Sequence, residues 1–161
     1  MKTLLFKSEN RGTADYGWLK PNYYFSFAQY HDPAKVHFGL LRVLNDDFFA
    51  GGGMFPTHPH DNMEIITIPF TGALKHKDST GGEGVIQAGD IQIMSAGTGV
   101  EHSEFNHAPD QETHFLQIWI EPLHMNVEPG YEQKSIPLNS KQGCLRLIAS
   151  SDGAQDSVRM N

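Results

Sequence analysis

Apolar and polar residues form short blocks along the chain, and most blocks end at a glycine, a proline or a polar turn. Aromatic and β-branched residues are concentrated in residues 22–30, 36–44, 62–70, 84–87, 90–94, 113–122 and 144–150. Short segments of this kind, with turn signals about every 8 to 12 residues, are typical of strands in a sandwich or barrel. The 16 glycines and nine prolines are spread through the whole chain, which leaves no room for a long helix. We therefore predict an all-β fold.

Three glycine-containing stretches are predicted to be turns or breaks, because glycine adopts positive φ at no steric cost. They are "DDFFAGGG" at 46–53, "DSTGGEG" at 78–84 and "SAGTG" at 95–99. After Ala149 the apolar pattern is lost and the residues become polar and small. We expect one domain over residues 1–150, followed at 151–161 by a polar tail or by the beginning of a further unit.

Composition narrows the classes of partner. The net charge of −7, without clustered Lys and Arg, argues against a nucleic-acid surface, since phosphate contacts need such clusters. No apolar run approaches the roughly 18 residues of a membrane span, and the first residues lack a signal-peptide core. The single cysteine, Cys144, cannot form an internal disulfide. These features predict a cytoplasmic protein with neither a nucleic-acid nor a membrane partner.

Two histidines stand one residue apart in "FPTHPHDNMEII", residues 55–66. In a strand, residues two apart point to the same face, so His58 and His60 can converge on one ion. Pro59 between them removes a backbone donor, which favours an edge strand. Glu64 has the same parity, and by this criterion alone it could face the same ion.

A second pair, His102 and Glu104, repeats this arrangement after a glycine-rich turn, in "GVEHSEF". Two such pairs on neighbouring strands would supply three nitrogens and one oxygen, a ligand set that suits a divalent transition metal better than magnesium or calcium. One H-x-H among nine histidines could also arise by chance, with the side chains exposed or structural. The six histidines without such a pairing are interpreted in that way: His31, His37, His76, His107, His114 and His124.

The spacing Gly52, His58, His60 and Glu64 resembles the first motif of the cupins, with Gly72 one position beyond its usual place. The second motif departs from that pattern, because Ser95 stands where proline is expected and the histidine follows "AGTGVE". In this departure, and in "HPHDNMEIITIPFTGALKHKDSTG" and "AGDIQIMSAGTGVEHSEFN", the chain is similar to the pirin family. The similarity extends from about residue 5 to residue 148.

This resemblance implies a jelly-roll-like cupin barrel that corresponds to the N-terminal half of a two-barrel protein. It implies metal ligands at His58, His60, His102 and Glu104, and it leaves Glu64 as a residue that orients a histidine. Iron(II) is the metal expected first, with manganese, nickel, copper, zinc or cobalt as alternatives. If the second barrel is absent, the surface that it would cover is expected to be masked by self-association as a homodimer.

Bacterial pirin-like proteins resemble quercetin 2,3-dioxygenases, which open a flavonol ring with O₂ and release carbon monoxide. The resemblance therefore implies a flavonol substrate, with Glu104 as a ligand and proton acceptor. Candidates for lining the pocket, for each of which plain core packing is the favoured interpretation, are Phe55, Met63, Met94 and Phe115. The alternative function is a metal-binding regulatory module that contacts a protein partner and lacks robust catalysis.

Overall fold

The computed structural model describes residues 5–136 and 143–161. Its elements are β-strands and two short 3₁₀ turns, η1 (Ser8–Asn10) and η3 (Ala154–Asp156). The predicted all-β fold is confirmed. Within the described ranges, none of the helices has the length and apolar content that crossing a bilayer requires.

The larger sheet contains seven strands, in the spatial order β1-β2-β3-β10-β5-β8-β11, and every neighbouring pair in it is antiparallel. Side chains on these strands alternate between the interior and the opposite face, as the pleat of a strand requires. The strands are β1 (Gly12–Thr13), β2 (Leu19–Tyr23), β3 (Leu41–Phe49), β10 (Thr113–Ile120), β5 (Glu64–Thr71), β8 (Asp90–Ser95) and β11 (Gly130–Ser135).

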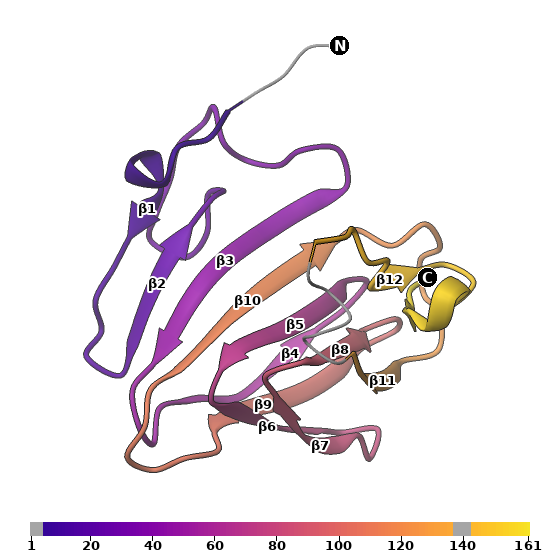
Figure 1. Ribbon diagram of the computed structural model, residues 1–161. Coiled ribbons are helices and arrows are strands. Elements are labelled where there is room, and N and C mark those ends of the chain that lie inside the picture. Colours follow the sequence, from indigo (N-terminus) through magenta and orange to yellow (C-terminus); the bar gives the residue numbers. More distant parts are fainter. Residues whose placement is uncertain (1–4, 137–142) are drawn as a thin grey trace.

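The smaller sheet contains four antiparallel strands in the order β4-β9-β6-β7 and lies across from the larger sheet (Figure 1). β4 is an edge strand, as Pro59 predicts, and its pairing with β9 is irregular between Phe55 and His58. The bulge changes which face the residues on each side of it present. The strands are β4 (Met54–His60), β9 (Val100–Asn106), β6 (Ala73–Asp78) and β7 (Glu83–Gln87).

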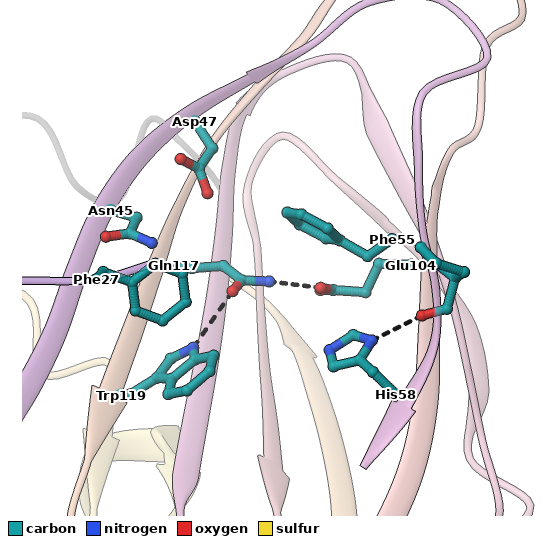
Figure 2. Close-up of a pocket in the computed structure, with 9 residues that line it drawn as sticks. Phe27, Asn45, Asp47, Phe55, His58, Glu104, Gln117 and Trp119 are labelled. Carbon is teal, nitrogen blue, oxygen red and sulfur yellow. Dashed lines mark hydrogen bonds between the residues drawn. The ribbon is translucent and has the colours of Figure 1, made fainter. Parts of the chain in front are cut away.

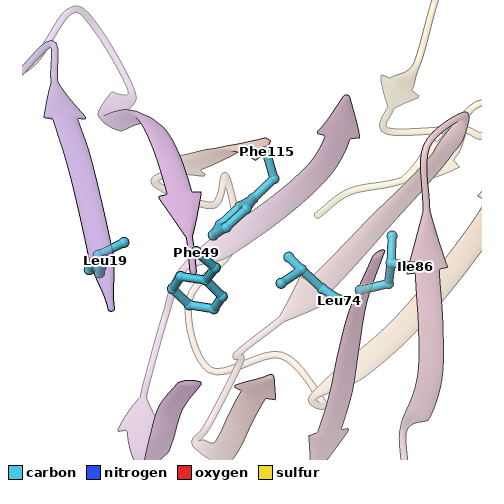
Figure 3. Close-up of a cluster of buried hydrophobic side chains, with 5 residues drawn as sticks. All are labelled: Leu19, Phe49, Leu74, Ile86 and Phe115. Atoms are coloured by element: carbon cyan, nitrogen blue, oxygen red, sulfur yellow. The ribbon is translucent and has the colours of Figure 1, made fainter. Parts of the chain in front are cut away.

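An apolar cluster joins the two sheets at one end of the barrel (Figure 3). β2, β3 and β10 contribute Leu19, Phe49 and Phe115 from the larger sheet, and Leu74 and Ile86 come from β6 and β7. Phe49 and Phe115 are fully buried, and their ring centroids lie 5.0 Å apart in an edge-to-face arrangement. Burial of this area holds the sheets together, and Phe55, which packs against the cluster, connects it to the polar side chains described below.

A second apolar cluster covers the opposite face of the larger sheet. Ile66 of β5 and Ile93 of β8 pack there against Ile136 and Val158. Val158 is fully buried and lies in β13 (Val158–Arg159), which pairs in parallel with β12 (Ala149–Ser150). The polar segment after Ala149 therefore returns to the sheet and packs on it through a few apolar side chains, beside β8 and β11 (Figure 1).

Several strand limits differ from those predicted. The segment 22–30 is a strand only as far as Tyr23, because its later aromatic rings pack on one another and on Trp119 instead of continuing the ladder, and Ala28 turns the chain at φ 49°. The strand predicted at 36–44 begins at Leu41 and continues through three polar residues to Phe49. Of segment 144–150 only the last two residues pair. β6 and β11 were not predicted, because their polar alternation hides the strand pattern.

The buried rings that join the sheets should dominate stability. Replacing Phe49, which is fully buried, by alanine should lower the free energy of unfolding by about 3 to 5 kcal/mol, because the cavity left behind adds to the lost burial. Phe70→Ala, at a ring that is 47% exposed, is the control and should cost less than about 1 kcal/mol. Urea unfolding measures both values, and equal losses would contradict this role of the cluster.

Candidate metal centre

β4 and β9 bring two of the predicted histidines face to face. Their register pairs His58 with His102, and the two Nε2 atoms lie 3.0 Å apart. The ring of His60, on the same strand as His58, lies with its centroid 4.8 Å from that of His58 and 4.9 Å from that of His102. One ring nitrogen from each residue lies within 4.8 Å of the other two. These three residues form the histidine cluster.

Hydrogen bonding sets which nitrogen of His58 carries a lone pair. Its Nδ1 donates to the Pro56 carbonyl oxygen at 2.7 Å, so Nε2 is left unprotonated and faces His102. The Nε2 atom of His60 is buried and has no hydrogen-bond partner in the described structure. Buried polar atoms are nearly always paired. The cluster thus presents nitrogen atoms toward one another, in a place where a proton or a cation must lie between them.

Burial keeps the imidazoles of His60 and His102 neutral. Removal from water, together with the neighbouring histidine His58, lowers the pKa of His60 to about 4. The same two causes, with further contributions from His60 and His76, lower the pKa of His102 to about 2. Metal ions bind the neutral form of imidazole, so the ligand-competent form is already present at neutral pH.

Glu104 is buried beside the cluster, at the end of a chain of hydrogen bonds. Gln117 Nε2 donates to its Oε2 at 2.5 Å, and Thr67 donates more weakly to its Oε1 at 3.4 Å. The indole N–H of Trp119 donates to Gln117 Oε1, which fixes the orientation of the amide (Figure 2). Burial raises the pKa of Glu104 to about 7, although both hydrogen bonds act in the opposite direction.

The carboxylate of Glu104 groups with a different pair of histidines. Its donor atom, one from His102 and one from His76 all lie within 4.8 Å of one another, whereas Glu104 does not belong to the group formed by the histidine cluster. His76, which the sequence indicates is structural or exposed, is fully buried, and its Nδ1 atom has no hydrogen-bond partner among the described residues. The overlooked signal is "HKD", which places His76 and Asp78 on one face of a strand.

Asp78 holds His76 in place. One carboxylate oxygen accepts from His76 Nε2 at 2.9 Å, and the other accepts from Thr80 and from the Gly82 amide in the following turn. Since His76 donates through Nε2, its Nδ1 keeps a lone pair that is directed into the interior. Burial lowers the pKa of His76, although Asp78 acts in the opposite direction.

Glu64 lies apart from both groups of donors. Its Oε2 accepts from Ser95 Oγ at 2.7 Å and from the Asn161 amide at 3.2 Å. The parity that relates Glu64 to His58 and His60 does not continue past the end of β4, because the chain turns at Asn62 (φ 45°) and β5 belongs to the other sheet. Glu64 contacts neither the histidine cluster nor its neighbours through a hydrogen bond, so the structure gives no support to a role in orienting a histidine.

The other five histidines do not belong to either donor group in the described structure. His31, His37, His107 and His124 are exposed. His114 Nε2 interacts with Asp46 at 2.6 Å, and its ring stacks on Phe48 at a centroid distance of 4.1 Å. These five histidines are therefore exposed or structural, as the sequence predicts.

A cavity of about 280 Å³ opens beside the histidine cluster and Glu104. His58 and Glu104 form part of its wall, and three aromatic side chains, Phe27, Phe55 and Trp119, supply much of the rest (Figure 2). Of the four predicted lining residues, only Phe55 belongs to the described wall of this cavity. Of the other three, Phe115 belongs to the cluster that joins the sheets, and Met63 and Met94 pack in a third apolar cluster with Ile65.

An antiparallel barrel with clustered histidines next to an internal cavity is the architecture of a cupin. A cupin domain of Cnp3 from Schizosaccharomyces pombe overlays with a TM-score of 0.52 at 10% identity, covering 74% of this chain and 75% of that one, which shows the fold alone. The model of the family described as Pirin matches residues 6–120. The chain belongs to the pirin family.

Individual relatives are similar over nearly the whole chain. A protein named quercetin 2,3-dioxygenase from Escherichia coli is 43% identical over 157 residues, which are 98% of this chain and 67% of that protein. A pirin-like protein of Caulobacter vibrioides is 46% identical over 139 residues, 86% of this chain and 60% of that protein. The crystal structure of the bacterial pirin YhhW of Escherichia coli in complex with nickel(II) has a TM-score of 0.88 at 42% identity, covering 95% of this chain and 65% of that one. The chain thus spans about two thirds of the length of these relatives.

The hydrogen bonds predict opposite tautomers for two of the buried histidines in metal-free protein. His58 should carry its proton on Nδ1, because Nδ1 faces a carbonyl oxygen, whereas His76 should carry it on Nε2, because Nε2 faces Asp78. Long-range ¹H–¹⁵N correlation spectra of the imidazole rings distinguish the two forms. Replacing Asp78 by leucine should remove the preference of His76 for the Nε2-protonated tautomer. The tautomer of His58 should stay unchanged. The reverse tautomer at either ring would contradict the geometry described.

Proposed function

We propose that the chain binds one divalent transition metal through His58, His60 and His102, with Glu104 as a fourth ligand, and acts on flavonols as a quercetin 2,3-dioxygenase. The observation that carries this proposal is the pair of Nε2 atoms at 3.0 Å, next to the unpartnered Nε2 of His60 and beside a cavity rich in aromatic side chains. Two relatives that share over 40% identity support it, one named quercetin 2,3-dioxygenase and one a pirin in complex with nickel(II).

The donors fit such a metal. Neutral imidazole nitrogens and a carboxylate oxygen suit iron(II), manganese, nickel, copper, zinc and cobalt, whereas magnesium and calcium favour oxygen ligands throughout. Iron(II) is the ion that we propose first. A nickel(II) complex of a pirin relative supports the same class of ion. The buried position of His102 and Glu104 limits access of water to the site.

Different residues around the cavity can serve different steps of flavonol oxidation. A bound divalent cation would act as a Lewis acid toward the 3-hydroxyl group of the flavonol. Glu104 lines the cavity and is held by Gln117, so its carboxylate can accept the proton that this hydroxyl releases. Phe27, Phe55 and Trp119 offer apolar faces to the flavonol rings and exclude water from the electron-rich substrate.

The alternative, a metal-binding module that contacts a protein partner without robust catalysis, uses the same histidines. The chain spans about two thirds of the length of its relatives, and the histidine cluster that it contains would serve metal binding with or without catalysis. The two functions differ in one outcome, namely flavonol turnover by metal-loaded protein.

Self-association as a homodimer stays a prediction, which light scattering at high concentration would check.

Turnover can be followed by the absorption band of quercetin. Metal-loaded protein in air should bleach this band at a rate that rises with protein concentration, because O₂ opens the conjugated ring. The double variant His58→Ala, His60→Ala should bleach it no faster than buffer, since it lacks two of the proposed ligands. If wild-type protein that metal analysis shows to be loaded also behaves like buffer, the dioxygenase function of this chain is wrong and the binding module is favoured.

The two buried glutamates provide a matched comparison. Glu104→Gln should lower metal affinity by about tenfold or more, as expected when a carboxylate next to a metal loses its charge. Glu64→Gln should stay within about threefold of wild type, because Glu64 bonds to Ser95 and Asn161 and belongs to neither donor group. Competition with a chromophoric chelator measures both affinities. If metal affinity falls more in Glu64→Gln than in Glu104→Gln, Glu64 and not Glu104 is the carboxylate ligand.

A further inference from the structure

The cavity beside the histidine cluster has a second polar wall, which the proposed chemistry does not use. Asn45 and Asp47 lie two apart on β3 and both line the cavity. Figure 2 shows them on one side of the view, with His58 and Glu104 on the other and with Gln117 between. A molecule held at the metal centre by one end would therefore reach this wall with its other end.

Both side chains are buried, and each has an oxygen that lacks a partner. Asn45 and Asp47 are 3% and 2% exposed, and the Oδ1 atom of each has no hydrogen-bond partner in the described structure. Removal from water raises the pKa of Asp47 well above its usual range, and the nearby Glu104 contributes to this rise. Polar groups in this state are rare in native proteins, because their desolvation is not compensated.

Unlike Asp47, the neighbouring Asp46 has a partner for each of its carboxylate oxygens. Asp46 points to the other face, where its two oxygens accept from Arg11 Nη1 at 2.6 Å and interact with His114 Nε2 at 2.6 Å. Asp47 has no such cation within hydrogen-bond distance among the described residues. A structural role in an ion pair therefore explains Asp46 and does not explain Asp47.

We propose that Asp47, assisted by Asn45, is a specificity-determining residue that accepts a hydrogen bond from a hydroxyl group of the aromatic substrate, at the end remote from the metal-binding oxygen. The substrate class is thus a hydroxylated aromatic molecule that carries at least one donor beyond the group at the metal. The aromatic side chains Phe27 and Trp119 flank the space between the two ends. Asp47 offers a lone pair in either protonation state, so recognition does not depend on its charge.

This inference rests on the proposed function for the orientation of the ligand, and a binding experiment without oxygen tests it separately from ring opening. Nickel-loaded protein is titrated under nitrogen with two probes, quercetin and 3-hydroxyflavone, which share the 3-hydroxyl group and differ in all other hydroxyls. Wild-type protein should bind quercetin more tightly. Asp47→Leu should weaken quercetin binding about tenfold or more and change 3-hydroxyflavone binding less than about threefold.

Two further variants make the comparison specific. Asp47→Asn keeps an acceptor oxygen and nearly the same shape, so it should retain most of the preference for quercetin. Asp110→Asn removes a carboxylate from an exposed loop and should match wild type. The inference is overturned if Asp47→Leu weakens both probes equally, if it leaves quercetin binding unchanged, or if folded wild-type protein shows no preference between the probes. If the protein distinguishes quercetin from 3-hydroxyflavone through Asp47 but never opens the flavonol ring, the proposed reaction is wrong and this inference stands.

Discussion

The antiparallel register of β4 on β9 is the constraint on which the site depends. It sets His58 opposite His102, and the same strand carries His60 to within reach of both. Because side chains alternate along a strand, a slip of one residue in this pairing would turn the histidines of one strand to the other face. The irregularity between Phe55 and His58 directs both residues toward the cavity, although their numbers differ in parity. One ladder thus supplies both the histidines and one apolar wall of the cavity.

The barrel combines a polar interior with apolar clusters that hold its sheets together. One cluster joins the sheets around Phe49 and Phe115, and another fastens the segment with Val158 to the opposite face of the larger sheet. Between them, most of the buried polar groups are paired in chains, such as Trp119 to Gln117 to Glu104. Among the described residues, the buried side-chain atoms without a hydrogen-bond partner lie at the histidines, at Asn45 and Asp47, and at two isolated sites. Unpaired groups concentrate where a metal and a substrate would supply partners.

The sequence alone predicted the elements with strong local signals. Alternating short segments indicated strands, Pro59 indicated an edge, and two motifs placed three histidines that the structure brings together. Glu64 shows the limit of parity, because a turn and a change of sheet separate it from His60. Asp47 and Gln117 could not be assigned, since only the pairing of distant strands places them near Glu104, and the "HKD" signal of His76 gave its face on a strand without that strand's position.

X-ray absorption spectroscopy at the edge of a bound nickel(II) ion tests the central claim most directly, because it counts the imidazoles in the metal's coordination shell. Wild-type protein should show three imidazole nitrogens with an added oxygen from a carboxylate, at about 2.0 to 2.2 Å. The variant that lacks His58 and His60 should retain no more than one imidazole. A wild-type spectrum with fewer than two imidazoles, or one that the double substitution leaves unchanged, would contradict the account.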